Sequence, residues 1–271
     1  MTTFSDTQLR EAIDAGDIIP VFQPVVCTDD GRIAGVEVLA RWYRADGSAV
    51  PPEAFIARAG RCGLILPLTL KLMTRVRQLL TAYSPRLPHP LTVGINAGPS
   101  CLREPDFTEA CRRFSTAFAP NIVQLAVEVT EHEPLTADLI PALTELRVTG
   151  AILVLDDYGT GFADVEALDI IRPDIVKLDR SLTRLAGEGD PDGRLSECLA
   201  LLGRRPEMRV LAEGVETEAE RHWLCEKGIH LAQGYYYASP GGLLAVTESM
   251  SNTKVKIIAE PFPVGGPGWY L

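Results

Sequence analysis

The chain has 271 residues, of which 46% are hydrophobic and 23% are charged, and its formal net charge at pH 7 is -10. This composition is typical of a large globular α/β domain. The negative charge argues against binding to DNA or to an anionic membrane surface. No apolar run is long enough to span a bilayer and the N-terminus lacks a signal-peptide pattern, so the sequence predicts a cytoplasmic protein without a membrane span.

The cysteines and histidines indicate no site of their own. Six cysteines are scattered along the chain and none forms a C-x-x-C pair, which argues against a zinc or redox motif. Scattered thiols in apolar surroundings are typical of a reducing compartment. The four histidines are isolated, so core or surface positions are expected for them rather than metal ligation.

The first third of the chain reads as one helix, two strands and two more helices. Ser5–Ala15 opens with a capping box and has the spacing of an amphipathic helix. Ile18–Cys27 and Ile33–Tyr43 have the composition of strands. Helices are predicted from Pro51 to Ala59 and over Leu64–Tyr83.

From residue 91 onward, short apolar strands alternate with helical segments. The predicted strands are Leu91–Asn96, Gln124–Thr130, Ala151–Asp157, Asp174–Asp179, Arg209–Glu213 and His230–Tyr237. The predicted helices are Phe107–Phe118, Ala137–Val148, Val165–Ile171, Leu195–Gly203 and Thr217–Lys227.

This alternation is typical of a parallel sheet, and the number of units favours a closed (β/α)₈ barrel of the TIM type. A doubly wound open sheet is the alternative, and the missing G-x-G-x-x-G pattern counts against it. Residues 1–244 are predicted to form this single domain. Residues 245–271 are predicted to be a C-terminal tail with no assigned role and with an edge strand at Lys254–Ala259.

Polar side chains occur where the predicted strands end, and the carboxyl ends of the strands carry the active site in barrels of this type. Asp156 and Asp157 follow four apolar residues directly. Burying adjacent carboxylates is costly, and a divalent cation is the simplest compensation. The pair alone fits ordinary turn chemistry before a glycine, but the pattern recurs. The side chains that share this placement are Glu37, Asn96, Glu128, Asp156, Asp157 and Glu213.

All six side chains offer oxygen atoms, which favours Mg²⁺ or Mn²⁺ over zinc. Two cations about 3.5–4 Å apart are the usual arrangement for phosphoester hydrolysis, and Asp156 is placed to bridge them. Lys177 would add a positive charge that positions water or phosphate. Each acid has a structural alternative, such as an internal ion pair of Lys177 with Asp179 or of Glu37 with Arg41.

Eight blocks of the sequence, in order, resemble the EAL-domain family of phosphodiesterases that linearise cyclic di-GMP. The resemblance runs from about Leu9 to Pro240. Its blocks are FQPVV at 22–26, GVEVLARW at 35–42, GINAG at 94–98, EVTE at 128–131, DDYGTG at 156–161, VKLD at 176–179, AEGVET at 212–217 and QGYYYASP at 233–240. The family fold is a TIM-like barrel whose first strand is antiparallel to the rest, and the resemblance implies the same for this chain.

The resemblance implies a centre of two metal ions, Mg²⁺ or Mn²⁺. The first ion would be bound by Glu37, Asn96, Glu128 and Asp156. The second would be bound by Asp156 and Asp157, with Glu213 acting through water. Lys177 would lie beside the nucleophilic water, so that Glu37, Lys177 and Glu213 are the expected catalytic residues. The implied reaction is hydrolysis of cyclic di-GMP to linear pGpG by two-metal activation of water.

The resemblance also implies contacts to the dinucleotide and to a second copy of the chain. Glu131 would anchor the DDYGTG loop, which in this family links the metal site to the interface of a homodimer. For Gln23 and Gln233, satisfying backbone groups inside the barrel is an equal alternative. The expected substrate contacts are Gln23, Leu39, Arg41, Asp179, Glu216, Gln233 and Pro240.

Three departures from the family pattern leave other functions open. The signature reads Glu37-Val38-Leu39, with valine for alanine, and no ligand is lost. Ala97-Gly98 replaces an apolar residue and a serine, which removes a hydrogen bond expected behind Asn96. Phe162-Ala163-Asp164 replaces an aromatic residue and two serines, which bears on loop dynamics and dimer coupling and not on metal binding. A catalytically silent cyclic di-GMP receptor is the main alternative. Metal-assisted proton abstraction or Schiff-base chemistry at Lys177 rests on fold analogy alone.

Overall fold

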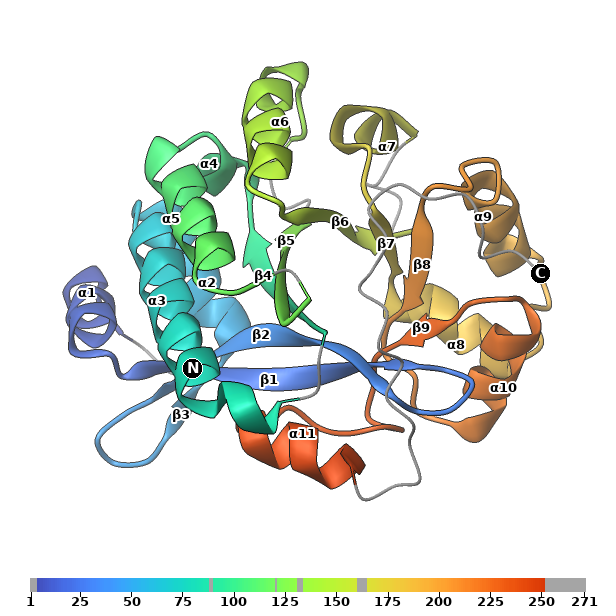
Figure 1. The fold of residues 1–271 in the computed structure, drawn as a ribbon, viewed down its shortest axis with the longest axis horizontal. Helices are drawn as coiled ribbons and strands as arrows, with labels where there is room; N and C mark the ends of the chain where they lie inside the picture. The colour runs from blue at the N-terminus through green and yellow to red at the C-terminus, as the bar shows by residue number, and fades with distance from the viewer. Residues whose placement is uncertain (1–3, 88–89, 120, 131–133, 160–164, 252–271) are drawn as a thin grey trace.

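The computed structural model describes the chain except for residues 1–3, 88–89, 120, 131–133, 160–164 and 252–271. Its described part contains one sheet (Figure 1). The strands are β1 (Ile18–Cys27), β2 (Ile33–Tyr43), β3 (Ala49–Val50), β4 (Leu91–Ala97), β5 (Val123–Val129), β6 (Ile152–Tyr158), β7 (Ile175–Leu178), β8 (Arg209–Ala212) and β9 (Leu231–Ala232).

The sheet closes on itself because β1 pairs with both β2 and β9. Eight of the nine described strands form the barrel, and β3 extends only the end of β2. β1 is antiparallel to both neighbours, whereas the pairs from β2 through β4 to β9 are parallel. The closed TIM-like barrel and its antiparallel first strand are therefore confirmed, and the open-sheet alternative is wrong.

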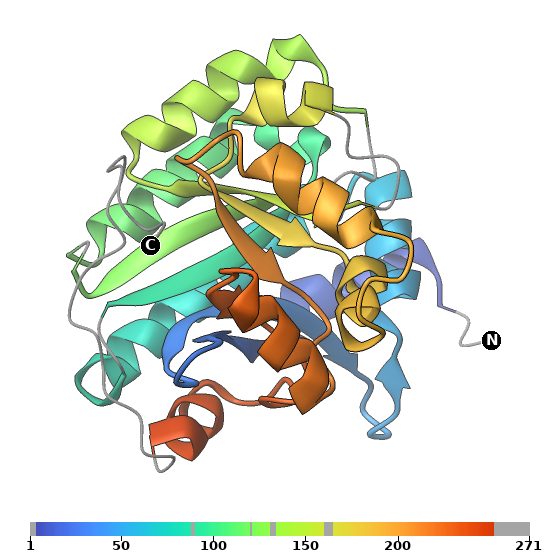
Figure 2. The same ribbon diagram turned by 90° about the vertical axis from the view of Figure 1, so that its right-hand side faces the viewer.

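Helices pack around the outside of the barrel, and Figure 2 shows those of the second half of the chain, yellow to red, over the strands. They are α1 (Asp6–Ala15), α2 (Pro52–Arg61), α3 (Ile65–Tyr83), α4 (Pro99–Leu102), α5 (Pro105–Thr116), α6 (Ile140–Val148), α7 (Val165–Ile171), α8 (Arg180–Gly187), α9 (Arg194–Leu202), α10 (Glu218–Glu226) and α11 (Leu243–Ser251), with 3₁₀ turns η1 (Ser84–Arg86) and η2 (Ala137–Leu139). Within the described ranges, no helix combines the length and the apolar character that crossing a bilayer requires.

Local signals set several helix starts as predicted. The Ser5 side chain accepts from the backbone of Gln8 and the Gln8 side chain accepts in return, which is a complete capping box for α1. Thr217 and Glu220 make the same exchange at α10. The helix α8 was not predicted, although Asp179 caps it by accepting from the backbone N–H of Ser181.

The last strand is shorter than predicted. The aromatic-rich segment 230–237 has strand-like composition, but β9 covers only Leu231–Ala232. Beyond β9, the backbone N–H of Val215 donates to the carbonyl oxygen of Gln233, and the N–H of Tyr236 donates to the carbonyl oxygen of Val215. The backbone of Gln233 and Tyr236 is therefore bonded to the loop after β8 and not to a neighbouring strand.

The helix α11 starts before residue 245 and packs on β1 through buried Leu243 and Val246. Its position was not predicted. The division into residues 1–244 and a tail stays a prediction, and the expected edge strand at Lys254–Ala259 lies outside the described residues.

Candidate metal centre and substrate pocket

The interior of the barrel has an apolar floor near the amino ends of the parallel strands. Its buried residues are Ala126, Ile152, Val154, Ile175, Leu211 and Leu231. Side chains in a strand alternate between two faces, so the residue two positions further along points to the same interior. Moving two positions along from five of these floor residues gives Glu128, Asp156, Lys177, Glu213 and Gln233, which are therefore placed as a polar layer above the floor.

Lys177 is the centre of this polar layer. Its side chain is 2% exposed, and its Nζ lies 2.7 Å from Glu128 Oε2, 2.7 Å from Glu213 Oε1, 2.9 Å from Asp156 Oδ1 and 3.3 Å from Glu37 Oε2. One ammonium thus contacts carboxylates from four different strands or strand ends. The alternative pairing of Lys177 with Asp179 is not what the structure shows, because Asp179 caps α8 instead.

Three neutral or positive donors hold the carboxylate of Glu37. Asn96 Nδ2 donates to Oε1 at 2.9 Å, and Gln233 Nε2 donates to Oε2 at 2.7 Å, beside the contact from Lys177. Gln233 also donates to Gln23 Oε1 at 3.0 Å. Gln233 therefore bonds to Glu37 and to Gln23, so these side-chain bonds are to other side chains and not to backbone groups of the barrel.

The charges of this layer do not balance. Burial alone would lower the pKa of Lys177, but the carboxylates around it outweigh burial and raise the pKa well above its usual value. Burial raises the pKa of Glu128 well above its ordinary range and that of Glu213 to about 8. For Glu37, burial acts in the same direction, but Lys177 and the two amides outweigh it and lower the pKa. One lysine cannot neutralise four carboxylates, so protons or cations must bind there.

Asp156 and Asp157 reach the same side of the sheet because the strand is distorted. Consecutive side chains of a regular strand point to opposite faces. Here the register of β6 with β7 shifts between Leu155 and Tyr158, and Asp157 has a φ of 55°. As a result, the carboxylates of Asp156, Asp157 and Glu213 lie within 4.8 Å of one another. Strain of this kind is typical of functional sites.

A glycine makes room for Glu128, and the sequence analysis did not identify it. Gly94 pairs with Glu37 across β2 and β4, and a Cβ atom at this position would lie 1.7 Å from Glu128 Oε1. The available signal was a glycine inside a strand, which indicates a close approach of another group to the backbone.

A pocket of about 260 Å³ adjoins the acidic layer at the barrel mouth. Its lining includes Glu37 and Glu213 from the layer. Three of the expected substrate contacts, Gln23, Glu216 and Gln233, also line it. A hollow of about 240 Å³ lies outside the barrel between α3 and α5, but none of the predicted site residues lines it. Chemistry rather than volume therefore selects the pocket at the mouth.

Comparison with known proteins bears on this arrangement directly. Among protein families, the one described as the EAL domain matches residues 6–240 of this chain. This chain belongs to the EAL-domain family. It is 36% identical over 255 residues to the probable cyclic di-GMP phosphodiesterase PdeG of Escherichia coli K12, covering 93% of this chain and 50% of that protein. It is 31% identical over 231 residues to the cyclic di-GMP phosphodiesterase PdeL of the same organism, covering 84% of this chain and 64% of that protein.

Solved structures agree with the EAL fold. An EAL-domain protein from Listeria monocytogenes superposes with a TM-score of 0.77 at 21% identity, covering 93% of this chain and 99% of that one. The YkuI protein of Bacillus subtilis, described in complex with cyclic di-GMP and calcium, superposes with a TM-score of 0.73 at 18% identity. The match covers 92% of this chain and 62% of the YkuI chain. The chain thus spans between half and two thirds of the length of PdeG and PdeL, and almost all of the Listeria chain.

Not every residue expected from the EAL resemblance lies at this pocket. Leu39, Arg41, Asp179 and Pro240 do not line it, and their contacts to substrate stay predictions. Arg41 donates to the backbone oxygen of Ala40 at 2.9 Å and not to Glu37, so the alternative ion pair is not formed. Glu131 lies outside the described residues.

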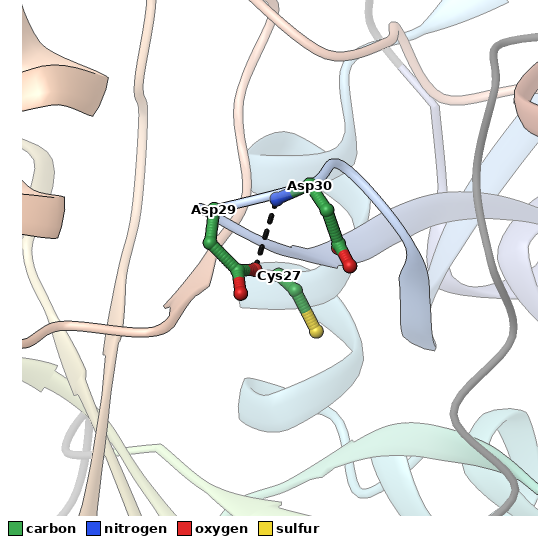
Figure 3. Close-up of side chains that lie close together, drawn as sticks. All are labelled: Cys27, Asp29 and Asp30. Carbon is green, nitrogen blue, oxygen red and sulfur yellow. Dashed lines mark hydrogen bonds between the residues drawn. The ribbon is translucent and has the colours of Figure 1, made fainter.

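A second group of metal-ligand types lies at the other end of the EAL barrel. Because β1 is antiparallel, the turn after it lies near the amino ends of the other strands, and there Cys27, Asp29 and Asp30 come together (Figure 3). Asp30 is paired with Arg32, and burial raises the pKa of Cys27 to about 11. A protonated thiol is a poor ligand, so these residues are best explained as a turn.

Proposed function

We propose that this EAL domain is a metal-dependent phosphodiesterase that hydrolyses cyclic di-GMP to linear pGpG. The observation that carries the proposal is the contact of one buried lysine with four carboxylates beside a pocket of about 260 Å³. Two relatives above 30% identity bear the name of cyclic di-GMP phosphodiesterases, one of them as probable. YkuI, described with cyclic di-GMP and calcium, has the same fold.

The residues present fit two divalent cations. The metal-ligand types in the acidic layer are carboxylates and the side-chain amides of Asn96 and Gln233, without His or Cys, and such oxygen ligands suit Mg²⁺ or Mn²⁺. The raised pKa values of Glu128 and Glu213 indicate that these carboxylates hold protons in the absence of metal and would release them when a cation binds. In this proposal Glu37, Asn96, Glu128 and Asp156 bind the first ion. Asp156 and Asp157 bind the second, with Glu213 acting through water.

The chain's own residues prepare the site for an anionic substrate. Metal ions in such a site activate water and offset the charge of the phosphodiester. Glu37 is held by three donors and its pKa is lowered, so it is a deprotonated ligand at neutral pH. Lys177 keeps its proton, and where cations offset the carboxylates that it contacts, its charge would orient water and phosphate oxygens. A lysine with a raised pKa is a poor amine nucleophile, which argues against Schiff-base chemistry.

Incubation of the purified protein with cyclic di-GMP and Mg²⁺, Mn²⁺ or Ca²⁺ tests the proposal. Chromatography should detect pGpG with Mg²⁺ or Mn²⁺. Glu37→Gln keeps the side-chain volume but removes the charge, and should abolish turnover. Glu207→Gln, an exposed position between α9 and β8, is the matched control and should be as active as the wild type. Absence of turnover with every ion contradicts the proposal. Tight binding without turnover would support the silent-receptor alternative instead.

We further infer that the active form is a cytoplasmic homodimer, on the strength of the family resemblance around the DDYGTG loop. Light scattering of the purified protein, with and without cyclic di-GMP, measures the mass directly. A monomer under both conditions would contradict the inference.

A further inference from the structure

The pocket at the barrel mouth has one exposed cation among its described lining residues. Three glutamates line it, Glu37, Glu213 and Glu216, and Arg180 is the only lysine or arginine that the described lining contains. Lys177 lies beneath and is committed to four carboxylates. An anionic ligand entering this pocket therefore meets the guanidinium of Arg180 first.

The backbone is shaped to hold Arg180 in this place. Arg180 opens α8, and its side chain lies against Gly214, where a Cβ atom would be 2.5 Å from Arg180 Cγ and 2.9 Å from Cδ. Gly214 has a φ of 66° and directly follows Glu213. A glycine at this point thus lets the arginine stem cross the loop that carries Glu213.

The ion pair that holds the guanidinium of Arg180 is weak. Arg180 Nη2 lies 2.5 Å from Glu216 Oε1, with the two side chains 50% and 36% exposed. Exposed ion pairs contribute little to stability and exchange readily. Arg180 can therefore leave Glu216 for a stronger anion, and Glu216 is then released as an acceptor for the N–H groups of a guanine base.

We propose that Arg180 positions the substrate by donating to the phosphate of the cyclic dinucleotide that is not being cleaved. This inference rests on the proposed function, in which one of the two phosphates lies at the metal ions. The second phosphate carries a charge that the metal centre does not offset. Guanidinium groups bind phosphate through paired, charge-assisted hydrogen bonds, and Arg180 is the described pocket residue able to make them.

Arg180→Gln tests the contact, with Arg184→Gln as the matched control. Arg184 is exposed on the same helix, and it does not line the pocket. A contact made equally in ground and transition states changes KM and leaves kcat unchanged. Arg180→Gln should therefore raise KM for cyclic di-GMP about 10-fold with kcat within about 2-fold. Arg184→Gln should match the wild type, and Arg180→Lys should restore part of the loss.

One further substrate and two inhibitors separate this role from a structural one. Bis(p-nitrophenyl) phosphate has only the phosphate under attack, so its hydrolysis should be equal in the wild type and Arg180→Gln. The product pGpG keeps the uncleaved phosphodiester beside the terminal phosphate that cleavage leaves, and its inhibition constant should rise by the same factor as KM. An equal loss of inhibition by guanosine would assign Arg180 to the base and overturn the phosphate contact.

The outcomes distinguish this inference from the proposed function. An active wild type with identical kinetics for Arg180→Gln and Arg184→Gln refutes the role of Arg180 and leaves the phosphodiesterase intact. A fall in hydrolysis of bis(p-nitrophenyl) phosphate by Arg180→Gln indicates damage to the centre and also refutes it. A wild type that hydrolyses no cyclic di-GMP refutes both.

Discussion

Gly94 lies beside Glu128, so adding one methyl group at residue 94 tests the geometry of the metal centre. In Gly94→Ala, the new Cβ atom would lie 1.7 Å from Glu128 Oε1, half the 3.4 Å at which ordinary contacts begin. It would lie 3.5 Å from Glu128 Cγ, so the side chain can stay in place up to that carbon while its carboxylate moves. Such a movement breaks the 2.7 Å contact to Lys177.

The size of both effects follows from this geometry. Overpacking a buried position by one carbon lowers the free energy of unfolding by about 1–3 kcal/mol. Moving a catalytic group by about 1 Å lowers turnover by about 100-fold. Gly94→Ala should therefore stay folded at 25 °C, as urea denaturation can check, and should lose about 100-fold in kcat for cyclic di-GMP in Mg²⁺.

Gly60→Ala is the matched control. Gly60 lies within α2, has no atom within 4 Å of the added carbon, and has no left-handed φ. Alanine there should raise the free energy of unfolding by about 0.5–1 kcal/mol and leave turnover unchanged. If Gly94→Ala kept wild-type turnover and stability, the close approach of Glu128 to β4 would be wrong, and so would the centre built on it.

The other predictions concern protons, backbone strain and a helix cap. Burial raises the pKa of Glu213 from the ordinary value of a glutamate to about 8, so the folded state binds the proton more tightly and this contribution to stability is lost as the pH rises. Urea denaturation in EDTA should thus give a free energy of unfolding that falls from about pH 5 to about pH 8, and a rise would contradict the burial of this acid. Asp157→Gly should relieve the strain of the φ of 55° and raise the free energy of unfolding by about 1 kcal/mol, while turnover falls because a carboxylate is lost. Asp157→Asn should lose turnover without the gain in stability. Equal stability of the two variants would mean that this backbone conformation stores little strain. Thr217→Ala removes the side-chain oxygen that caps α10 and should lower the free energy of unfolding by about 1 kcal/mol, whereas an unchanged urea midpoint would mean that water replaces the cap.

Much of the site could be predicted because the strand ends can be recognised locally. Glu128 and Asp156 stand at or near the ends of short apolar runs, so the sequence alone predicts that both lie towards the carboxyl ends of strands. Oxygen ligands at successive strand ends likewise predict a common mouth and a hard cation. Capping residues such as Ser5 and Thr217 act within one helical turn, and their role was readable for the same reason.

Contacts between distant strands could not be predicted in this way. Lys177 was expected to add charge beside the site, and only the register of the closed barrel shows that it joins four carboxylates. The predicted strand 230–237 ends at Ala232, because the backbone beyond it makes hydrogen bonds to Val215 in the loop after β8.

Residue types and local pattern thus indicate which side chains end the parallel strands and which chemistry they offer. The closed barrel settles which of them touch, how Gly94 and Gly214 clear space for Glu128 and Arg180, and how β1 closes the ring. The reason is physical: a side chain's direction is set by its own strand, whereas its partners are set by strands that meet only when the barrel closes.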